Sequence, residues 1–159
     1  MPRIDHVLLA VALALVGLGA DQATSLRKVV ERGNEAWIKA GRTLDKGVLE
    51  PFFDGQAFAD LARILASMRE DQMYMDLELV RIEYRSVVVD PDGKNGSVAV
   101  SEFWRVTSRH LGTGECEVIL KPRERRQTYR LTTTGQGWRI IRIEEDPNPP
   151  KLETEECPH

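Results

Sequence analysis

The apolar residues of the chain are spaced in two different ways along its length. Between residues 24 and 45 they recur at steps of three and four, the period of a helix with one buried face. The same spacing predicts a second helix over residues 56–74, with Asp54 as its N-cap. The two predicted stripes consist of Leu26, Val29, Val30, Gly33, Trp37, Ile38, Gly41 and Leu44, and of Phe58, Leu61, Ala62, Leu65 and Met68.

From Asp76 onward the apolar period changes to two, which is typical of β-strands. Strands are predicted over residues 77–90, 97–110, 116–133 and 138–145, with the third interrupted at 122–126. Strands this long normally bend. The order predicts an α+β fold over residues 24–146, in which N-terminal helices pack on a strongly curved antiparallel sheet of four to five strands, a cone-like roll. A loose Pro- and acid-rich tail is expected over residues 147–159.

The N-terminus carries an uninterrupted run of apolar residues and glycine from Val7 to Ala20, preceded by Arg3. As a helix this run would span about 21 Å at ~1.5 Å per residue, short of the ~30 Å of a bilayer core. Its length and the small residues at its end predict a secretory signal peptide over residues 1–20. The alternatives are one uncleaved membrane helix and a buried helix. The leading prediction is therefore an exported domain, whether periplasmic, secreted or envelope-associated, with membrane contact only if the segment is retained.

Charge and histidine content narrow the function classes. The formal net charge is −3, so the chain lacks the basic excess that a nucleic-acid binder uses to neutralise phosphates. His110 is the one histidine inside the predicted domain, and the two cysteines are far from each other in sequence. These residues do not match a zinc site, and no nucleotide-binding or metalloprotease motif occurs. We therefore expect no metal and no cofactor.

Cys116 and Cys157 are the two cysteines of the chain, and both follow the predicted signal peptide. In an oxidising compartment they can form a disulfide, which would fix the tail to a strand. The alternative is two unpaired thiols, one buried and one on the tail.

Three short motifs carry a family resemblance: AVSE (Ala99–Glu102), TYRL (Thr128–Leu131) and GWRI (Gly137–Ile140). Together with a tryptophan on the first predicted helix, they resemble the nuclear-transport-factor-two-like (SnoaL-like, cystatin-like roll) superfamily. Within it, the chain is most similar to the intermembrane-space domain of plastid and cyanobacterial division proteins, over residues 27–145. The resemblance implies a protein partner and allows a homodimer through the sheet.

Period-two alternation assigns one set of side chains to the concave face of the sheet, beneath the helices. That set is expected to contain Val80, Ile82, Tyr84, Ser86 and Val88; Val98, Val100, Glu102, Trp104 and Val106; Tyr129 and Leu131; and Trp138 and Ile140. Glu102 is a carboxylate in an apolar row, and burial of such a group is costly unless a donor or cation faces it. The candidate pocket lining is Trp37, Tyr84, Glu102, Trp104 and Tyr129.

Two functions are consistent with this pattern. The leading prediction is an exported non-enzymatic domain that presents its sheet or rim to a protein partner at the cell envelope. In that case Glu102 is structural, paired with Arg130 or Arg142 or turned to solvent by a bulge, and the tryptophans are core. The alternative is a binder of a small apolar ligand or a SnoaL-like enzyme, with Glu102, Tyr84 and Tyr129 as proton-transfer residues. It predicts a pocket of about 300 Å³ or more. The basic cluster at 121–126 is predicted to be a solvated loop or a site for an anionic partner.

Overall fold

The computed structural model describes residues 5–158, and of residues 5–19 it describes only the backbone. Helix α1 covers Asp5–Thr43, so it begins well before the predicted start at residue 24. It ends because Leu44 adopts a left-handed backbone (φ 55°) while its side chain stays buried. The short 3₁₀ helix η1 (Lys46–Leu49) leads to α2 (Gly55–Glu70).

Asp54 is the N-cap of α2, as predicted, and its carboxylate accepts a hydrogen bond from the Gly55 amide at 2.6 Å. The helix ends four residues earlier than the predicted residue 74, because Gln72 takes a positive φ of 57° and the chain turns into the first strand. The early end leaves residues 73–76 to the sheet rather than to the helix.

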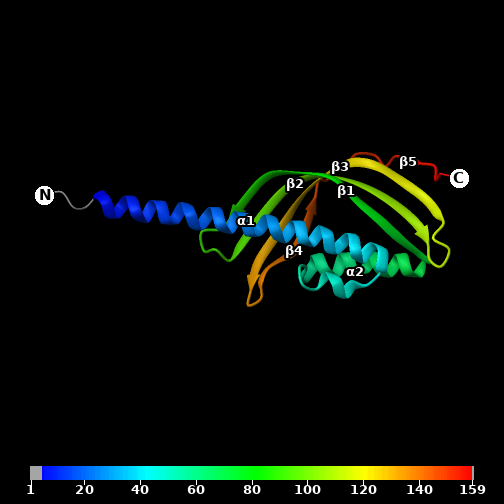
Figure 1. The fold of residues 1–159 in the computed structure, drawn as a ribbon, viewed down its shortest axis with the longest axis horizontal. Coiled ribbons are helices and arrows are strands. Elements are labelled where there is room, and N and C mark those ends of the chain that lie inside the picture. Colours follow the sequence, from blue (N-terminus) through cyan, green and yellow to red (C-terminus); the bar gives the residue numbers. More distant parts are fainter. Residues whose placement is uncertain (1–4, 159) are drawn as a thin grey trace.

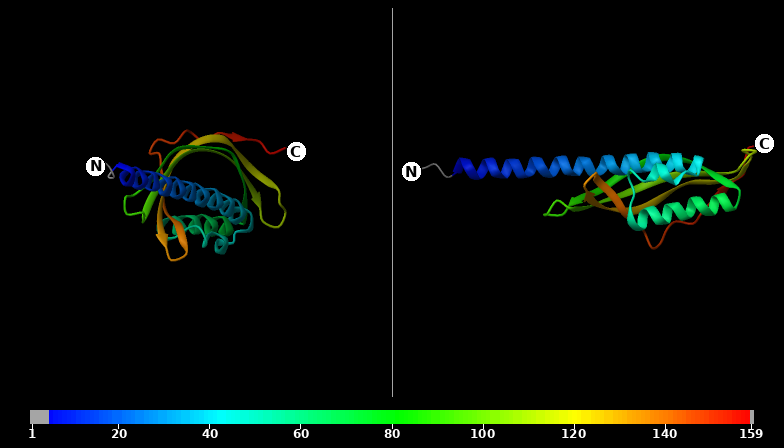
Figure 2. Two further views of the ribbon diagram at one scale, coloured as in Figure 1. Left: turned by 60° about the vertical axis from the view of Figure 1, so that its left-hand side comes forward. Right: turned by 90° about the horizontal axis from the view of Figure 1, so that it is seen from below.

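The strands form one antiparallel sheet in the order β1-β2-β3-β4. They are β1 (Met73–Val89), β2 (Asn95–His110), β3 (Cys116–Thr134) and β4 (Gly137–Glu145). The sheet bends into an arch, and α1 and α2 lie under its concave side (Figures 1 and 2). The N-terminal part of α1 extends beyond the sheet. The predicted α+β arrangement of helices on a curved sheet is confirmed.

Two β-bulges in β1 change which of its side chains face the helices. The register against β2 shifts between Leu79 and Arg81 and again between Tyr84 and Ser86, so one extra residue is inserted at each place. The predicted inward set of β1 is therefore wrong in three positions. Ile82 and Tyr84 face inward, but Val80 and Val88 are 50% and 52% exposed and Ser86 is exposed. The inward residues are Met75, Leu77, Leu79, Ile82, Tyr84, Val87 and Val89.

The predicted interruption of the third strand at residues 122–126 is also wrong. β3 continues through Pro122, because a register shift between Trp104 and Val106 of β2 leaves an extra residue on β3 at that point. A bulge is one of the few places where a sheet accepts proline, since proline cannot donate to the ladder. The basic cluster at 121–126 therefore lies on a strand rather than on a solvated loop.

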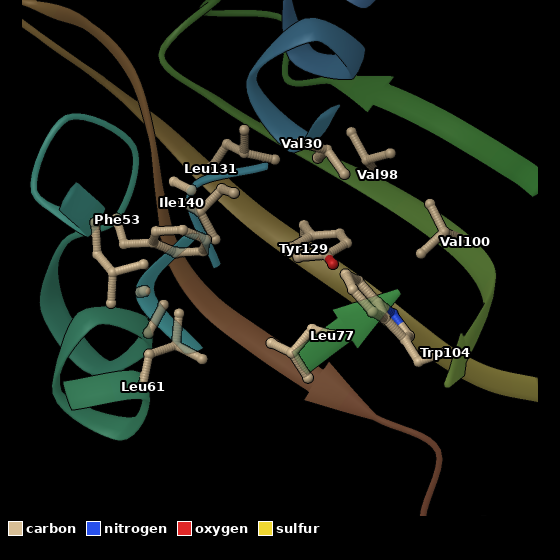
Figure 3. Packing of buried hydrophobic residues seen from close by; sticks show 14 of the residues in the cluster. Val30, Phe53, Leu61, Leu77, Val98, Val100, Trp104, Tyr129, Leu131 and Ile140 are labelled. Carbon is tan, nitrogen blue, oxygen red and sulfur yellow. The ribbon is translucent and has the colours of Figure 1, made fainter. Parts of the chain in front are cut away.

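The core lies between the concave face of the sheet and the two helices, and Figure 3 shows part of it. Val30 of α1, Phe53 before α2 and Leu61 of α2 pack against Val98, Leu131 and Ile140 of the sheet. Two glycines let α1 approach the strands closely. A Cβ atom on Gly33 would lie 3.0 Å from the Ile140 side chain, and one on Gly41 would lie 2.8 Å from the Leu77 side chain.

Replacing Gly41 with valine is expected to lower the free energy of unfolding by about 2 kcal/mol. The added Cβ would also lie 3.1 Å from the Met75 carbonyl oxygen, which is backbone and cannot turn aside. The modest gain in helix propensity over glycine does not offset this overpacking. Urea unfolding of the variant tests the prediction. The control is Gly135→Ala, where an added Cβ meets nothing within 4 Å and little change is expected; equal effects of the two substitutions would contradict the close approach.

The C-terminal tail, predicted to be loose, is bound to β3. A two-residue strand, β5 (Thr154–Glu155), pairs with Ile119 and Leu120, and a disulfide joins Cys116 to Cys157. Of the two alternatives left open by the sequence, the structure contains the bonded pair.

The predicted signal peptide over residues 1–20 cannot be compared with the structure in full. Residues 1–4 lie outside the described residues, and the side chains of residues 5–19 are not described. Within the described part of the chain, no helix has the length and apolar character needed to cross a membrane.

Candidate functional site

A cavity of about 220 Å³ lies between α1, α2 and the concave face of the sheet. Apolar residues form much of its wall, and Ile64, which is 43% exposed, stands at its rim. Its lining residues are Asn34, Trp37, Phe53, Ala57, Asp60, Leu61, Ile64, Glu102, Trp104, Arg125, Gln127, Tyr129, Ile143 and Glu145. The volume is smaller than the 300 Å³ expected for a ligand pocket.

Glu102 lies at the cavity wall and is fully buried. One carboxylate oxygen accepts hydrogen bonds from the Asn34 amide at 2.7 Å and the Tyr129 hydroxyl at 2.9 Å. The other accepts from the Trp104 indole at 2.8 Å and the Gln127 amide at 2.6 Å. Four donors therefore occupy the lone-pair positions of the two carboxylate oxygens.

Each donor comes from a different position in the fold. Asn34 is on the buried side of α1, Trp104 follows Glu102 by two residues on the same face of β2, and Gln127 and Tyr129 occupy one face of β3. The Gln127 amide also lies 2.7 Å from the Tyr129 oxygen. Figure 3 shows Tyr129 and Trp104 next to each other in the core. The network thus ties α1 to two strands through one carboxylate.

Arg125 of β3 is paired with Glu102 of β2 in the antiparallel register, which makes it the basic residue directly opposite this network. Partial burial lowers the pKa of its guanidinium, and the neighbouring Tyr129 and Glu102 side chains oppose that effect. Its side chain forms an ion pair with Glu145 of β4 rather than with Glu102. Arg130 and Arg142, the predicted partners of Glu102, both pair with Glu144 instead. The predicted arginine bridge to Glu102 is therefore wrong, and so is the alternative in which a bulge turns Glu102 to solvent.

The two candidate tyrosines occupy different surroundings. Burial, the charge of Glu102 and the hydrogen bond to Glu102 together raise the pKa of Tyr129 well above its ordinary value. Tyr84 does not line the cavity; its hydroxyl donates to Glu31 at 3.2 Å, and Arg27 stacks on its ring. Burial and Glu31 raise the pKa of Tyr84 as well. The structure therefore brings Glu102 and Tyr129 together and leaves Tyr84 outside.

The cavity contains Trp37, Trp104, Glu102 and Tyr129 from the predicted set. Sequence reasoning missed Asn34, Arg125 and Gln127. Asn34 could have been found from its position: it is a polar residue four positions after Val30, so it lies on the apolar face of the first helix. Arg125 and Gln127 precede Tyr129 at steps of two, which places them on its face of β3.

The stability of the fold is expected to fall as pH rises above about 10, partly because of Tyr129. A raised folded-state pKa means that the unfolded chain loses this proton first, so its contribution is complete below the ordinary tyrosine pKa of 10.0 and declines above it. The slope from one such group approaches about 1.4 kcal/mol per pH unit. Urea unfolding between pH 8 and 11 measures it. Tyr129→Phe should be less stable at pH 8 and show a shallower decline; an unchanged slope would contradict the assignment.

Glu102 accepts hydrogen bonds from four protein side chains in this structure. A general base must accept a proton from a reacting group, so proton transfer by Glu102 would require a substrate to replace one of these donors. Within residues 20–158, no group of three His, Cys, Asp or Glu side chains is arranged to hold a metal ion.

Comparisons with known proteins identify the fold. No family model matches the chain, and no curated protein matches it either. The crystal structure of the intermembrane space region of the chloroplast protein ARC6 is similar, with a TM-score of 0.69 and 17% identity over 77% of this chain and 95% of that one. A nuclear transport factor 2 (NTF2-like) superfamily protein from Salmonella enterica subsp. enterica serovar Typhimurium str. LT2 has a TM-score of 0.53 and 12% identity over 83% and 94%. The chain therefore has the NTF2-like fold, and the predicted resemblance is confirmed at that level.

Proposed function

We propose that this chain is an exported, non-enzymatic domain that binds a protein partner at the cell envelope. The observation that carries the proposal is the saturation of Glu102, the one charged side chain among the fully buried residues of the described chain, by four protein donors. A carboxylate used in this way holds α1 on the sheet and has no acceptor position left for a substrate proton.

Two observations support export. A disulfide persists in oxidising compartments such as the periplasm or the cell exterior, and Cys116 and Cys157 are joined. The similar region of ARC6 comes from an intermembrane space. A signal peptide over residues 1–20 would deliver the domain there, and its removal would leave Leu26 and Val30, the buried contacts of α1 nearest to the cut, in place. Mass measurement of the processed protein tests this: loss of about 20 residues is expected, whereas an intact chain indicates a retained anchor.

The outer face of β1 is the surface that we assign to the partner. Val80 and Val88 point outward, where each is about half exposed, and Arg81, the residue after Val80, stacks on Phe103 of β2 at 4.0 Å from the ring centre. Such apolar side chains on an outer sheet face favour a protein surface, including that of a second copy paired through the sheet.

Photo-crosslinking in cells tests this surface. A photoreactive residue at position 80 or 88 of the full chain is expected to crosslink a specific protein or a second copy. The same residue at Ile64, which is also exposed but lies on α2 at the cavity rim, is the matched control. Crosslinks at Ile64 but not at positions 80 and 88 would contradict the assignment.

A second function, binding of a small apolar ligand, is supported by the cavity. Its 220 Å³ lie between Trp37, Leu61 and Trp104, which suit a flat apolar molecule. Native mass spectrometry of the purified chain, with Leu61→Trp to fill the space, tests it. A bound small molecule that is lost in Leu61→Trp would favour this function over the first.

A further inference from the structure

Strand β1 lies at one end of the sheet. Within the described residues it pairs with β2 along one edge and with no strand along the other. That second edge, which we call the β1 edge, presents backbone N–H and C=O groups along a strand of 17 residues. A long strand edge can accept another strand, and proteins usually protect it with charged side chains or bulges. The β1 edge carries both features, and together they restrict the strand that it can accept.

The two bulges restrict the register of pairing. Ile82 is the middle one of the β1 side chains that face the helices, which in order are Met75, Leu77, Leu79, Ile82, Tyr84, Val87 and Val89. When a second copy is placed antiparallel with Ile82 opposite Ile82, Leu79 of each copy lies opposite Tyr84 of the other. Leu77 lies opposite Val87 in the same way. All these side chains stay on one face, because each bulge sets two residues of one copy against a single residue of the other.

The same register pairs opposite charges on the outer face. Arg85 of each copy lies opposite Glu78 of the other, and Arg81 lies opposite Glu83. Arg85 is exposed and forms no ion pair within the described residues. The other three side chains are 55–60% exposed, and their own ion pairs, Glu78 with Arg105 and Arg81 with Glu83, are open to solvent. Such exposed pairs are weak, so their exchange for pairs between two copies costs little.

The neighbouring registers oppose like charges. With Ile82 opposite Tyr84, Glu83 would face Glu83 and Arg81 would face Arg85. In the register shifted the other way, Arg81 would face Arg81 and Glu78 would face Glu83. Like charges directly opposite each other destabilise a strand pair. A shift by a single residue would turn apolar side chains to the outer face. The register about Ile82 is therefore favoured over its neighbours.

We propose that the β1 edge pairs with the β1 edge of a second copy, antiparallel and in register about Ile82. The two sheets then continue as one across the dimer, and the unpaired backbone groups of both edges are satisfied. The proposal rests on the proposed interaction role and deepens it, because it names a second copy as a partner at the edge of β1 rather than on its outer face.

Charge exchange in the full chain tests this register. Arg85→Glu replaces the attraction to Glu78 with repulsion in both halves of the dimer, and Glu78→Arg does the same with the opposite sign. Each single variant is expected to dimerise about tenfold or more weakly than the unchanged chain in sedimentation velocity at low salt. An equal mixture of the two single variants should recover the dimer, because each supplies the charge that the other needs. Glu78→Arg/Arg85→Glu in one chain should recover it as well.

Arg130→Glu is the matched control. It makes the same charge change on β3, where Arg130 is 49% exposed, and it should dimerise like the unchanged chain. Recovery in the mixture also shows that the single variants are folded. The proposal is overturned by an unchanged chain that stays monomeric, by single variants that dimerise normally, or by a mixture that does not recover. None of these results affects crosslinks from positions 80 and 88 to a different protein, so the proposed function fails or stands separately.

Discussion

Replacing Glu102 with alanine is expected to lower the free energy of unfolding by about 4 kcal/mol. Four buried donors, on Asn34, Trp104, Gln127 and Tyr129, would lose their common acceptor. Each buried donor left without a partner costs roughly 1–3 kcal/mol, although Tyr129 can turn its hydroxyl to the Asn34 oxygen, 3.0 Å away. Chemical unfolding followed by tryptophan fluorescence measures the loss.

Two variants serve as controls for this prediction. Glu102→Gln should lose about half as much stability. Its one amide oxygen still accepts from two of the donors, whereas its NH2 group faces the other two donors and cannot accept from them. Glu83→Ala removes an exposed acid of β1 whose ion pair with Arg81 is open to solvent, and it should change stability by less than about 0.5 kcal/mol. If Glu102→Ala were as stable as Glu83→Ala, the buried network could not be what joins α1 to the sheet.

Removal of the disulfide is the second substitution with a large expected effect. The bridge closes a loop between residues 41 positions apart, and for a loop of that size the lost freedom of the unfolded chain corresponds to about 4 kcal/mol. Cys157→Ala should therefore lower the free energy of unfolding by about that amount, and the variant should unfold at a lower urea concentration. The folded core should persist, because the tail contributes little burial.

A double-mutant cycle sharpens the test of the disulfide. Cys116→Ala and Cys157→Ala each break the same bond, so the double variant should be no less stable than either single variant. Additive losses would show that the two sulfur atoms stabilise the protein separately, contrary to the bond between them.

The sequence predicts where the helices and strands lie better than it predicts which side chains of each strand point toward the helices. Helix and strand periods, the Asp54 cap and the long bending strands were enough for an α+β roll, because each depends on local spacing. The facing of β1 depends on where extra residues enter the strand, and the extra residue at Val80 fits the alternating pattern as well as a regular one does. The predicted interruption of the third strand at Pro122 was wrong for a similar reason. Without knowledge of the partner strand, a bulge that accepts proline cannot be distinguished from the end of a strand.

The candidate site shows the same limit. Glu102, Trp104 and Tyr129 lie on regular stretches of β2 and β3, so alternation placed them correctly. The partners of Glu102 could not be chosen from sequence, because Asn34 is 68 residues away and its approach depends on how α1 crosses the sheet. Tyr84 was predicted to line the site because its side chain faces inward, yet the curvature of β1 brings its hydroxyl to Glu31 on the exposed side of α1.

The bulges in β1 also determine how tolerance to substitution should vary along that strand. Polar replacements should be harmful at odd positions from Met75 to Leu79, at even positions from Ile82 to Tyr84, and at odd positions again from Val87 to Val89. A saturation library scored for folded protein would therefore reverse its parity twice within seventeen residues. Conservation patterns along this strand would carry the same double reversal, so a strand of this kind is easily misread as three short strands.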